Sequence, residues 1–312
     1  MAMLPSSGGF GPIGGGDGEV PPILLDSALA APQQSSFFQS FLLLPRPQRL
    51  GLQTVYRFAS AVDSLVDAFP PDTDEQRQRK RQWLAWWRHQ LERIYGGEPF
   101  HPALMPLARV IEYFHLPKQY FLLLLDGCER DLVQRRYATF QELKDYCYCV
   151  ASSIGLLCIE IFGYKHPEAR QYAIHLGYAL QLTNILRDVK ADKDRGYIYL
   201  PLEDLQRFNY SEADLIAERY DERFIELMRF QAQRARSYYH RARAYLHPDD
   251  RATLFAAEAM DRIYYRLLEK MELDDFQVFR YRYRVSTLHK LWIVLHSWLS
   301  SYVLIRRLRS ML

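Results

Sequence analysis

Apolar residues recur three and four positions apart through most of this chain, for example at Leu182, Ile185 and Leu186. This spacing places them on one face of an α-helix. There is no sustained alternation of apolar and polar residues, the pattern that indicates a half-buried strand. Because 49% of the residues are hydrophobic, the chain can bury a large core. We therefore predict an all-α fold, a helical bundle around a central cavity.

Residues 1–34 differ in composition from the rest of the chain. They are rich in Gly, Pro, Ser and Ala, with three consecutive glycines at 14–16. Such a segment buries too little to order itself, so we predict a disordered tail. From residue 35 to 312, prolines and glycines separate helical segments by short loops, which favours antiparallel neighbours. No internal linker divides this region, so we expect a single domain over 35–312.

Two segments carry oxygen-bearing side chains at a spacing of four. Asp63 and Asp67 form the first set, and Asn184, Asp188 and Asp192 form the second. On a helix, each set lies along one face. Two acidic stripes in an apolar bundle are costly unless a cation lies between them, and Mg²⁺ prefers oxygen ligands. The sequence therefore predicts a magnesium site, with solvated acidic faces as the alternative for either stripe alone.

Basic residues near the second stripe suit a diphosphate. Arg187 and Arg195 flank its carboxylates, and a planar guanidinium can bond two phosphate oxygens at once. Metal and arginine together can stabilise a leaving diphosphate, so a carbon–oxygen bond can break without a nucleophilic side chain. A helix-end or salt-bridge role is the alternative for each arginine.

A third segment, Tyr146 to Gly155, carries the small residues Ala151, Ser152 and Gly155 on an apolar helix. Small side chains leave room beside the backbone. That room suits either a neighbouring helix, which is the commoner reason, or a ligand chain.

The net charge, the cysteine spacing and the apolar stretches exclude several classes of function. The 40 basic and 37 acidic residues leave a net charge of +3, without the basic excess expected of a nucleic-acid binder. The four cysteines lack zinc-like spacing and follow no secretory signal, which favours a reducing cytosol. No Gly-x-Gly-x-x-Gly motif lies between a predicted strand and a helix, so we expect no Rossmann-type nucleotide site. The longest uncharged stretch, Leu291 to Ile305, is too short to span a bilayer comfortably, so it is either core or a membrane-surface helix.

Three motifs together resemble a known family. The segment 181–192 (Gln-Leu-Thr-Asn-Ile-Leu-Arg-Asp-Val-Lys-Ala-Asp), with Arg-Gly and Tyr-Leu-Pro within 195–201, strongly resembles the second aspartate motif of the squalene/phytoene synthase family. Segment 146–155 resembles the central motif of these head-to-head prenyl synthases, and 63–67 resembles the first aspartate motif. The resemblance runs in order over about residues 35–290.

Within the family, shorter motifs look most like the bacterial presqualene diphosphate synthase branch; they include Trp86-Trp87-Arg88, His101-Pro102, Asp126-Gly127 and Phe162-Gly-Tyr164. The resemblance implies the isoprenoid-synthase helical fold, Mg²⁺ and two molecules of farnesyl diphosphate. One ionises to an allylic cation, the double bond of the other attacks it, and proton loss closes a cyclopropane. The product would be presqualene diphosphate, a precursor of squalene and hopanoids.

The resemblance also assigns roles to residues. The metal ligands it implies are Asp63, Asp67, Asn184, Asp188 and Asp192. The implied catalytic residues are the four aspartates of that set together with Tyr146. The implied substrate-binding residues are Tyr56, Val150, Ala151, Gln181, Arg187, Arg195 and Tyr199.

The chain departs from the family pattern at Ser60, Ser64, Ala68 and Tyr197, where charged residues are usual. Each departure removes a charge from the diphosphate-and-metal zone. Two alternatives to presqualene diphosphate synthesis therefore stand: phytoene or squalene synthesis on the same fold, and a non-catalytic paralogue that binds prenyl diphosphate. We expect a cytoplasmic protein, as the cysteines indicate. Because the implied substrate is apolar, we also expect transient contact with the inner membrane through residues 291–305. Partner enzymes of squalene synthesis are a further expectation.

Overall fold

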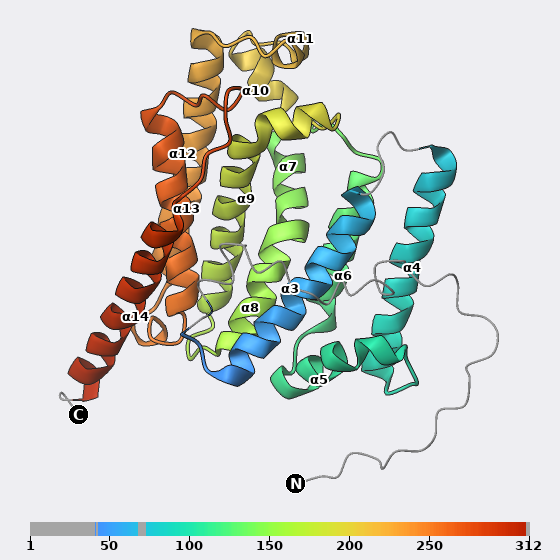
Figure 1. Ribbon diagram of the computed structural model, residues 1–312, viewed down its shortest axis with the longest axis vertical. Helices are drawn as coiled ribbons and strands as arrows, with labels where there is room; N and C mark the ends of the chain where they lie inside the picture. The colour runs from blue at the N-terminus through green and yellow to red at the C-terminus, as the bar shows by residue number, and fades with distance from the viewer. Residues whose placement is uncertain (1–40, 42, 68–72, 310–312) are drawn as a thin grey trace.

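The computed structural model of the chain describes residues 41, 43–67 and 73–309, apart from the side chains of 67 and 302–309. All regular secondary structure in these ranges is helical, and one isolated bridge joins Arg136 to Ile198. Figure 1 shows the longer helices packed side by side in one bundle. The all-α prediction is confirmed. The predicted tail, residues 1–34, lies outside the described residues.

In chain order the helical elements are α3 (Arg46–Asp67), α4 (Asp74–Gly96), η1 (Pro102–Leu104), α5 (Met105–Phe114), α6 (Lys118–Asp131), α7 (Phe140–Cys147), η2 (Tyr148–Ser152), α8 (Ser153–Phe162), α9 (Ala169–Asp194), α10 (Leu202–Arg207), α11 (Glu212–Ile216), α12 (Glu222–Tyr245), η3 (Pro248–Asp250), α13 (Phe255–Leu273) and α14 (Thr287–Arg309).

Local sequence sets where helices begin and end. At the start of α4 the hydroxyl of Thr73 accepts from the backbone N–H of Gln76 at 3.2 Å, and the Gln76 side chain accepts from the Thr73 backbone at 2.9 Å. This reciprocal cap satisfies two N–H groups that the helix itself leaves unpaired. The same helix ends at Gly96 and is capped by Gly97, whose positive φ of 71° is accessible to glycine without strain.

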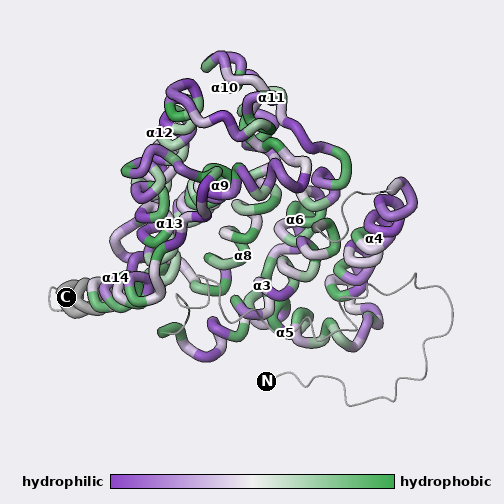
Figure 2. Tube along the Cα trace, turned by 45° about the horizontal axis from the view of Figure 1, so that its top comes forward, coloured by the Kyte–Doolittle hydropathy of each residue, from purple (hydrophilic) through white to green (hydrophobic). Residues whose placement is uncertain are grey.

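Helix α9 lies in the middle of the bundle, with α12 on one side and α8 with η2 on the other (Figure 1). Elements α7, η2 and α8 follow one another without a break, and η2 is a π-helical turn. Figure 2 shows hydrophobic residues along α8 in the interior and hydrophilic residues along α4 at the edge. The hydrophobic core includes buried residues of α8 and α9 and extends to α3, α4, α6, α12 and α13.

The small residues of segment 146–155 serve this close packing. A Cβ on Gly177 of α9 would lie 2.6 Å from the Cα of Ser152, and one on Gly155 would lie 3.0 Å from the carbonyl oxygen of Ala173. These contacts involve backbone atoms, which cannot give way as a flexible side chain can. The helix-packing alternative therefore applies to Ser152 and Gly155.

One continuous helical stretch in the described residues, Phe140–Phe162, is long and apolar enough to cross a membrane, with a mean hydropathy of 1.4. Of its most apolar window, 56% is buried inside the fold. Core helices commonly show such a composition, and this stretch contains α8 at the centre of the bundle.

We expect the Gly177→Ala variant to be less stable by about 1–3 kcal/mol, because the added methyl group must displace the Ser152 backbone. Urea unfolding followed by circular dichroism measures the change. Gly96→Ala is the matched control, since a Cβ there would meet no atom closer than the Cγ of Glu98 at 3.7 Å. Equal stability of the two variants would contradict the close packing of η2 and α9.

Candidate active site

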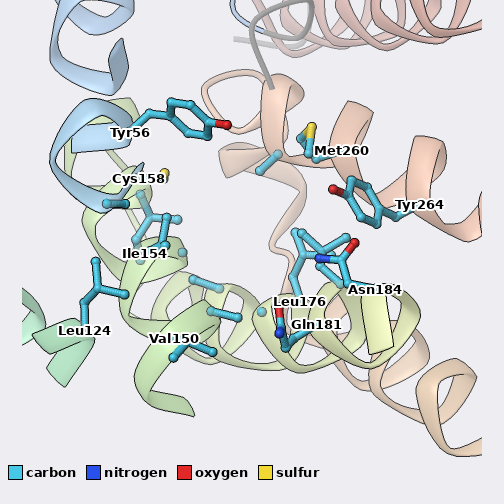
Figure 3. A pocket seen from close by; sticks show the side chains of 18 of the residues that line it. Tyr56, Leu124, Val150, Ile154, Cys158, Leu176, Gln181, Asn184, Met260 and Tyr264 are labelled. Carbon is cyan, nitrogen blue, oxygen red and sulfur yellow. The ribbon is translucent and has the colours of Figure 1, made fainter. Parts of the chain in front are cut away.

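A cavity of about 330 Å³ opens between α3, α8, α9 and α13. Its lining is mainly apolar, with aliphatic and aromatic side chains from all four helices. Figure 3 shows the hydroxyl groups of Tyr56 and Tyr264 pointing into it from α3 and α13, with Gln181 and Asn184 on α9. The volume falls within the usual range for small-molecule sites.

The cavity brings together one residue from each of the two acidic motifs, whereas Asp188 and Asp192 of the second motif are not among its lining residues. Asp63 of the first motif and Asn184 of the second both line it, as does Gln181. Asp63 is exposed, so this part of the lining faces the opening. Asp67 ends α3, and its side chain lies outside the described part of the chain.

Asn184 carries a feature that fits a cation. Its Oδ1 atom is buried and has no hydrogen-bond partner among the described residues. A buried carbonyl oxygen without a donor costs on the order of 1–3 kcal/mol, so such a group usually serves a ligand or water. Together with the carboxylate of Asp63 it supplies hard oxygen donors of the kind that Mg²⁺ takes.

Asp188 lies one turn further along α9 and is held by two arginines. Its carboxylate accepts from the Nε of Arg187 at 2.9 Å, and from Arg282 at 2.7 and 3.0 Å. Burial by itself would raise the pKa of Asp188, but the hydrogen bonds from Arg187 and Arg282 outweigh it and lower the pKa. Arg187 also interacts with Tyr264, which connects this ion-pair cluster to the cavity wall.

Asp192 lies a further turn along and has the opposite shift. Burial raises its pKa to about 6, although Arg195, at 2.7 Å from its Oδ1, opposes the rise. The charge of Asp188 adds to the rise. The two carboxylates on one stripe thus differ in proton affinity, because burial dominates at Asp192 while two arginine hydrogen bonds outweigh burial at Asp188.

Tyr146 and Tyr199 lie in a buried tyrosine cluster and are not among the residues that line the cavity. Their rings stack at 5.5 Å, and their hydroxyls donate to the carboxylate of Asp131 at 2.8 and 3.3 Å. Burial raises the pKa of Tyr146 well above its usual value, so its hydroxyl stays protonated. Val150 and Ala151, from the same segment as Tyr146, do line the cavity.

At two of the positions where the chain departs from the family pattern, the described residues show what occupies the space. Ser60 lines the cavity beside Asp63. The ring of Tyr197 stacks on Tyr199 at 5.9 Å, and the guanidinium of Arg135 lies 5.3 Å above it. A cation therefore remains next to Tyr197, supplied by a different segment.

Sequence reasoning missed Arg282 and Asp131. Arg282 is in the non-helical segment between α13 and α14, 94 positions from its partner Asp188. Asp131 ends α6 in a charged stretch that resembles an ordinary helix end. Neither has a local pattern that indicates its partner.

A separate group of donor atoms lies outside the cavity. Ligand atoms of His166, His247 and Asp249 are within 4.8 Å of one another. These residues belong to the segments before α9 and α13. Two imidazoles favour transition metals over Mg²⁺, and none of the predicted magnesium ligands is in this group.

The sequence profile of the squalene/phytoene synthase family matches residues 30–289. The chain belongs to this family. The resemblance stated from the motifs is thus confirmed, and with it the head-to-head prenyltransferase class. Most of the described fold lies inside the matched region.

Individual relatives agree with the family. A phytoene synthase from Arthrospira platensis is 37% identical over 279 residues, covering 84% of this chain and 88% of that protein. A presqualene diphosphate synthase from Zymomonas mobilis is 31% identical over 270 residues, covering 86% and 91%. A crystal structure of a dehydrosqualene synthase in complex with ligand superposes with a TM-score of 0.74 at 27% identity, covering 86% and 92%. The phytoene synthase is the more similar of the two enzymes compared by sequence.

We expect Asp131→Ala to reduce the free energy of unfolding by about 1–3 kcal/mol, because the buried hydroxyls of Tyr146 and Tyr199 lose their acceptor. Chemical unfolding measures the loss. Asp126→Ala, on the same helix, is the control: its side chain is 49% exposed and pairs with Arg88 at the surface. If both variants unfold at the same denaturant concentration, the tyrosine cluster does not depend on Asp131.

Proposed function

We propose that this chain is a Mg²⁺-dependent synthase that joins two prenyl diphosphates head to head and releases diphosphate. The observation that carries the proposal is the cavity, whose mainly apolar lining includes the polar side chains of Asp63, Gln181 and Asn184. The unpartnered Oδ1 of Asn184 supports an electrophilic ligand there. An apolar pocket with a few oxygen donors suits a prenyl chain with a metal-bound headgroup.

The residues that would hold the metal are Asp63, Asp67, Asn184, Asp188 and Asp192. Bound Mg²⁺ would supply positive charge to the leaving diphosphate and so favour breakage of the carbon–oxygen bond. All five residues offer oxygen atoms, which is the donor type that this cation requires.

Arg187 and Arg282 would exchange partners when substrate binds. Both now neutralise the carboxylate of Asp188. If the Asp188 carboxylate binds a metal ion instead, the two guanidinium groups can donate to diphosphate oxygens, for which their planar fork is well suited. Arg195, which donates to Asp192, would make the same exchange.

The apolar wall would protect the carbocation that ionisation leaves behind. Side chains such as Val150, Ile154 and Leu176 exclude water, which would otherwise trap the cation as an alcohol. The hydroxyls of Tyr56 and Tyr264 project into the same space (Figure 3). Burial raises the pKa of Tyr264, so its phenol stays neutral and can orient the substrate by hydrogen bonding. Attack by the second double bond and loss of a proton complete the reaction.

Two products compete. The sequence motifs favour presqualene diphosphate from farnesyl diphosphate, whereas the higher identity to a phytoene synthase favours phytoene, made from the longer geranylgeranyl diphosphate. A non-catalytic binding role, a cytoplasmic location, and contact with partner enzymes or a membrane remain predictions from the sequence.

We expect purified protein with Mg²⁺ to release pyrophosphate from farnesyl or geranylgeranyl diphosphate, and Asp188→Ala to lower the rate about a hundredfold or more. Product analysis by mass spectrometry then separates presqualene diphosphate from phytoene. Asp194→Ala is the matched control on α9, since its side chain is 52% exposed and pairs with Lys193. Binding of both substrates without pyrophosphate release from the unmutated protein would support the non-catalytic paralogue instead.

We expect Arg282→Gln to affect two measurements in opposite directions. The KM for the prenyl diphosphate should rise about tenfold, because a charged donor to the diphosphate is lost. The Mg²⁺ concentration for half-maximal rate should fall, because Asp188 loses a competing cation. Arg280→Gln is the control, an exposed arginine two positions away. A variant that matches this control in both measurements would show that Arg282 has no part in substrate binding.

A further inference from the structure

Helix α14 exposes a continuous apolar stripe. The exposed fractions are 81% for Leu288, 40% for Leu291, 61% for Trp292, 48% for Leu295 and 46% for Leu299. Spacings of three and four place all five on one face of the helix. Single exposed apolar residues are ordinary, but a contiguous row of large ones commonly marks a surface that binds something.

The opposite face of α14 is packed against α13, so the stripe cannot turn inward. Ile293, Val294 and Ser297 are buried, and the hydroxyl of Ser301 donates to the backbone carbonyl of Arg251 at 3.2 Å. Figure 1 shows α14 along the outer flank of the bundle beside α13. The sequence left open whether the Leu291 to Ile305 stretch is core or a membrane-surface helix. In the described part of this stretch, one face of the helix is buried in the core and the other is exposed.

Charge indicates the kind of partner. Helix α14 contains no acidic residue, and its basic residues are Lys290 near the start and Arg306, Arg307 and Arg309 at the end. On the adjoining α13, Arg262 contacts His296 of α14 at 2.9 Å. An apolar stripe accompanied by basic residues complements a lipid bilayer, which has an apolar interior beneath anionic headgroups.

We propose that α14 binds in the plane of an anionic lipid bilayer through the stripe Leu288, Leu291, Trp292, Leu295 and Leu299. Tryptophan suits this position because its amphipathic ring favours the headgroup region. A second copy of the chain fits less well, since a two-fold contact through the same stripe would bring the basic residues of both helices together. The binding does not depend on the reaction proposed above.

The placement connects the bilayer with the cavity. Met260 and Tyr264 of α13 line the cavity, and α14 packs against α13. The bilayer surface would therefore lie one helix away from the apolar pocket. For a prenyl substrate or product, this shortens the path through water, a consequence that rests on the proposed function.

Vesicle flotation of the full chain tests the proposal without substrate. We expect binding to vesicles of phosphatidylcholine with phosphatidylglycerol, weaker binding to phosphatidylcholine alone, and a decrease with added salt. The triple variant Trp292→Gln, Leu295→Gln, Leu299→Gln should lower the partition coefficient about tenfold or more. The matched control is Tyr113→Gln, Val133→Gln, Ile216→Gln, at positions that are 66%, 61% and 56% exposed on other elements.

Trp292→Phe provides a second measurement. Trp83, Trp86 and Trp87 are buried, and Trp298 of α14 is half-buried against the core. Trp292 is the exposed tryptophan among the described residues, so we expect a vesicle-induced blue shift of tryptophan emission to come mainly from it and to be largely lost in this variant. Equal flotation of the two triple variants would overturn the proposal. So would a concentration-dependent dimer, seen by sedimentation without lipid, that only the α14 variant abolishes. Circular dichroism confirms that each variant is folded.

Discussion

The contact between α9 and the η2–α8 segment is the constraint on which the rest of the structure depends. Gly177 lies directly against the backbone of Ser152, with no room for a side chain. Because this contact sets the position of α9, the next turns of the same helix carry Gln181 and Asn184 to the cavity. Stability and site geometry are therefore coupled, since any residue that separates these helices also moves the polar residues that α9 contributes to the pocket.

Desolvation then governs the charges along α9. The carboxylates of Asp188 and Asp192 are largely removed from water, and each is stabilised by arginine rather than left alone. In the proposed reaction, substrate and metal would enter a site whose charges are already in place. An exchange of partners avoids the full cost of burying new charge, and it keeps the donors pre-organised for the leaving diphosphate.

Within the fold of its family, this chain has two local features of its own. Tyr197 stands where the family usually has an arginine, yet the guanidinium of Arg135 lies over its ring, so the local positive charge is retained from another segment. Helix α14 adds an apolar, basic outer surface next to α13, which also forms part of the cavity wall. A prenyl diphosphate substrate would account for both features, because its chain needs an apolar path and its headgroup needs cations.

Periodicity alone predicts the helices, because apolar spacing of three and four reports a buried face whatever packs against it. The stripe of Asn184, Asp188 and Asp192 is likewise readable, since it depends only on the geometry of one helix. The pairing of Arg282 with Asp188 is not, because it joins segments 94 positions apart. Nor does any local pattern show that Tyr146 faces a tyrosine cluster instead of the cavity, or that α14 keeps one face exposed. Burial is set by the neighbours that a side chain meets in three dimensions, and those neighbours come from distant parts of the chain.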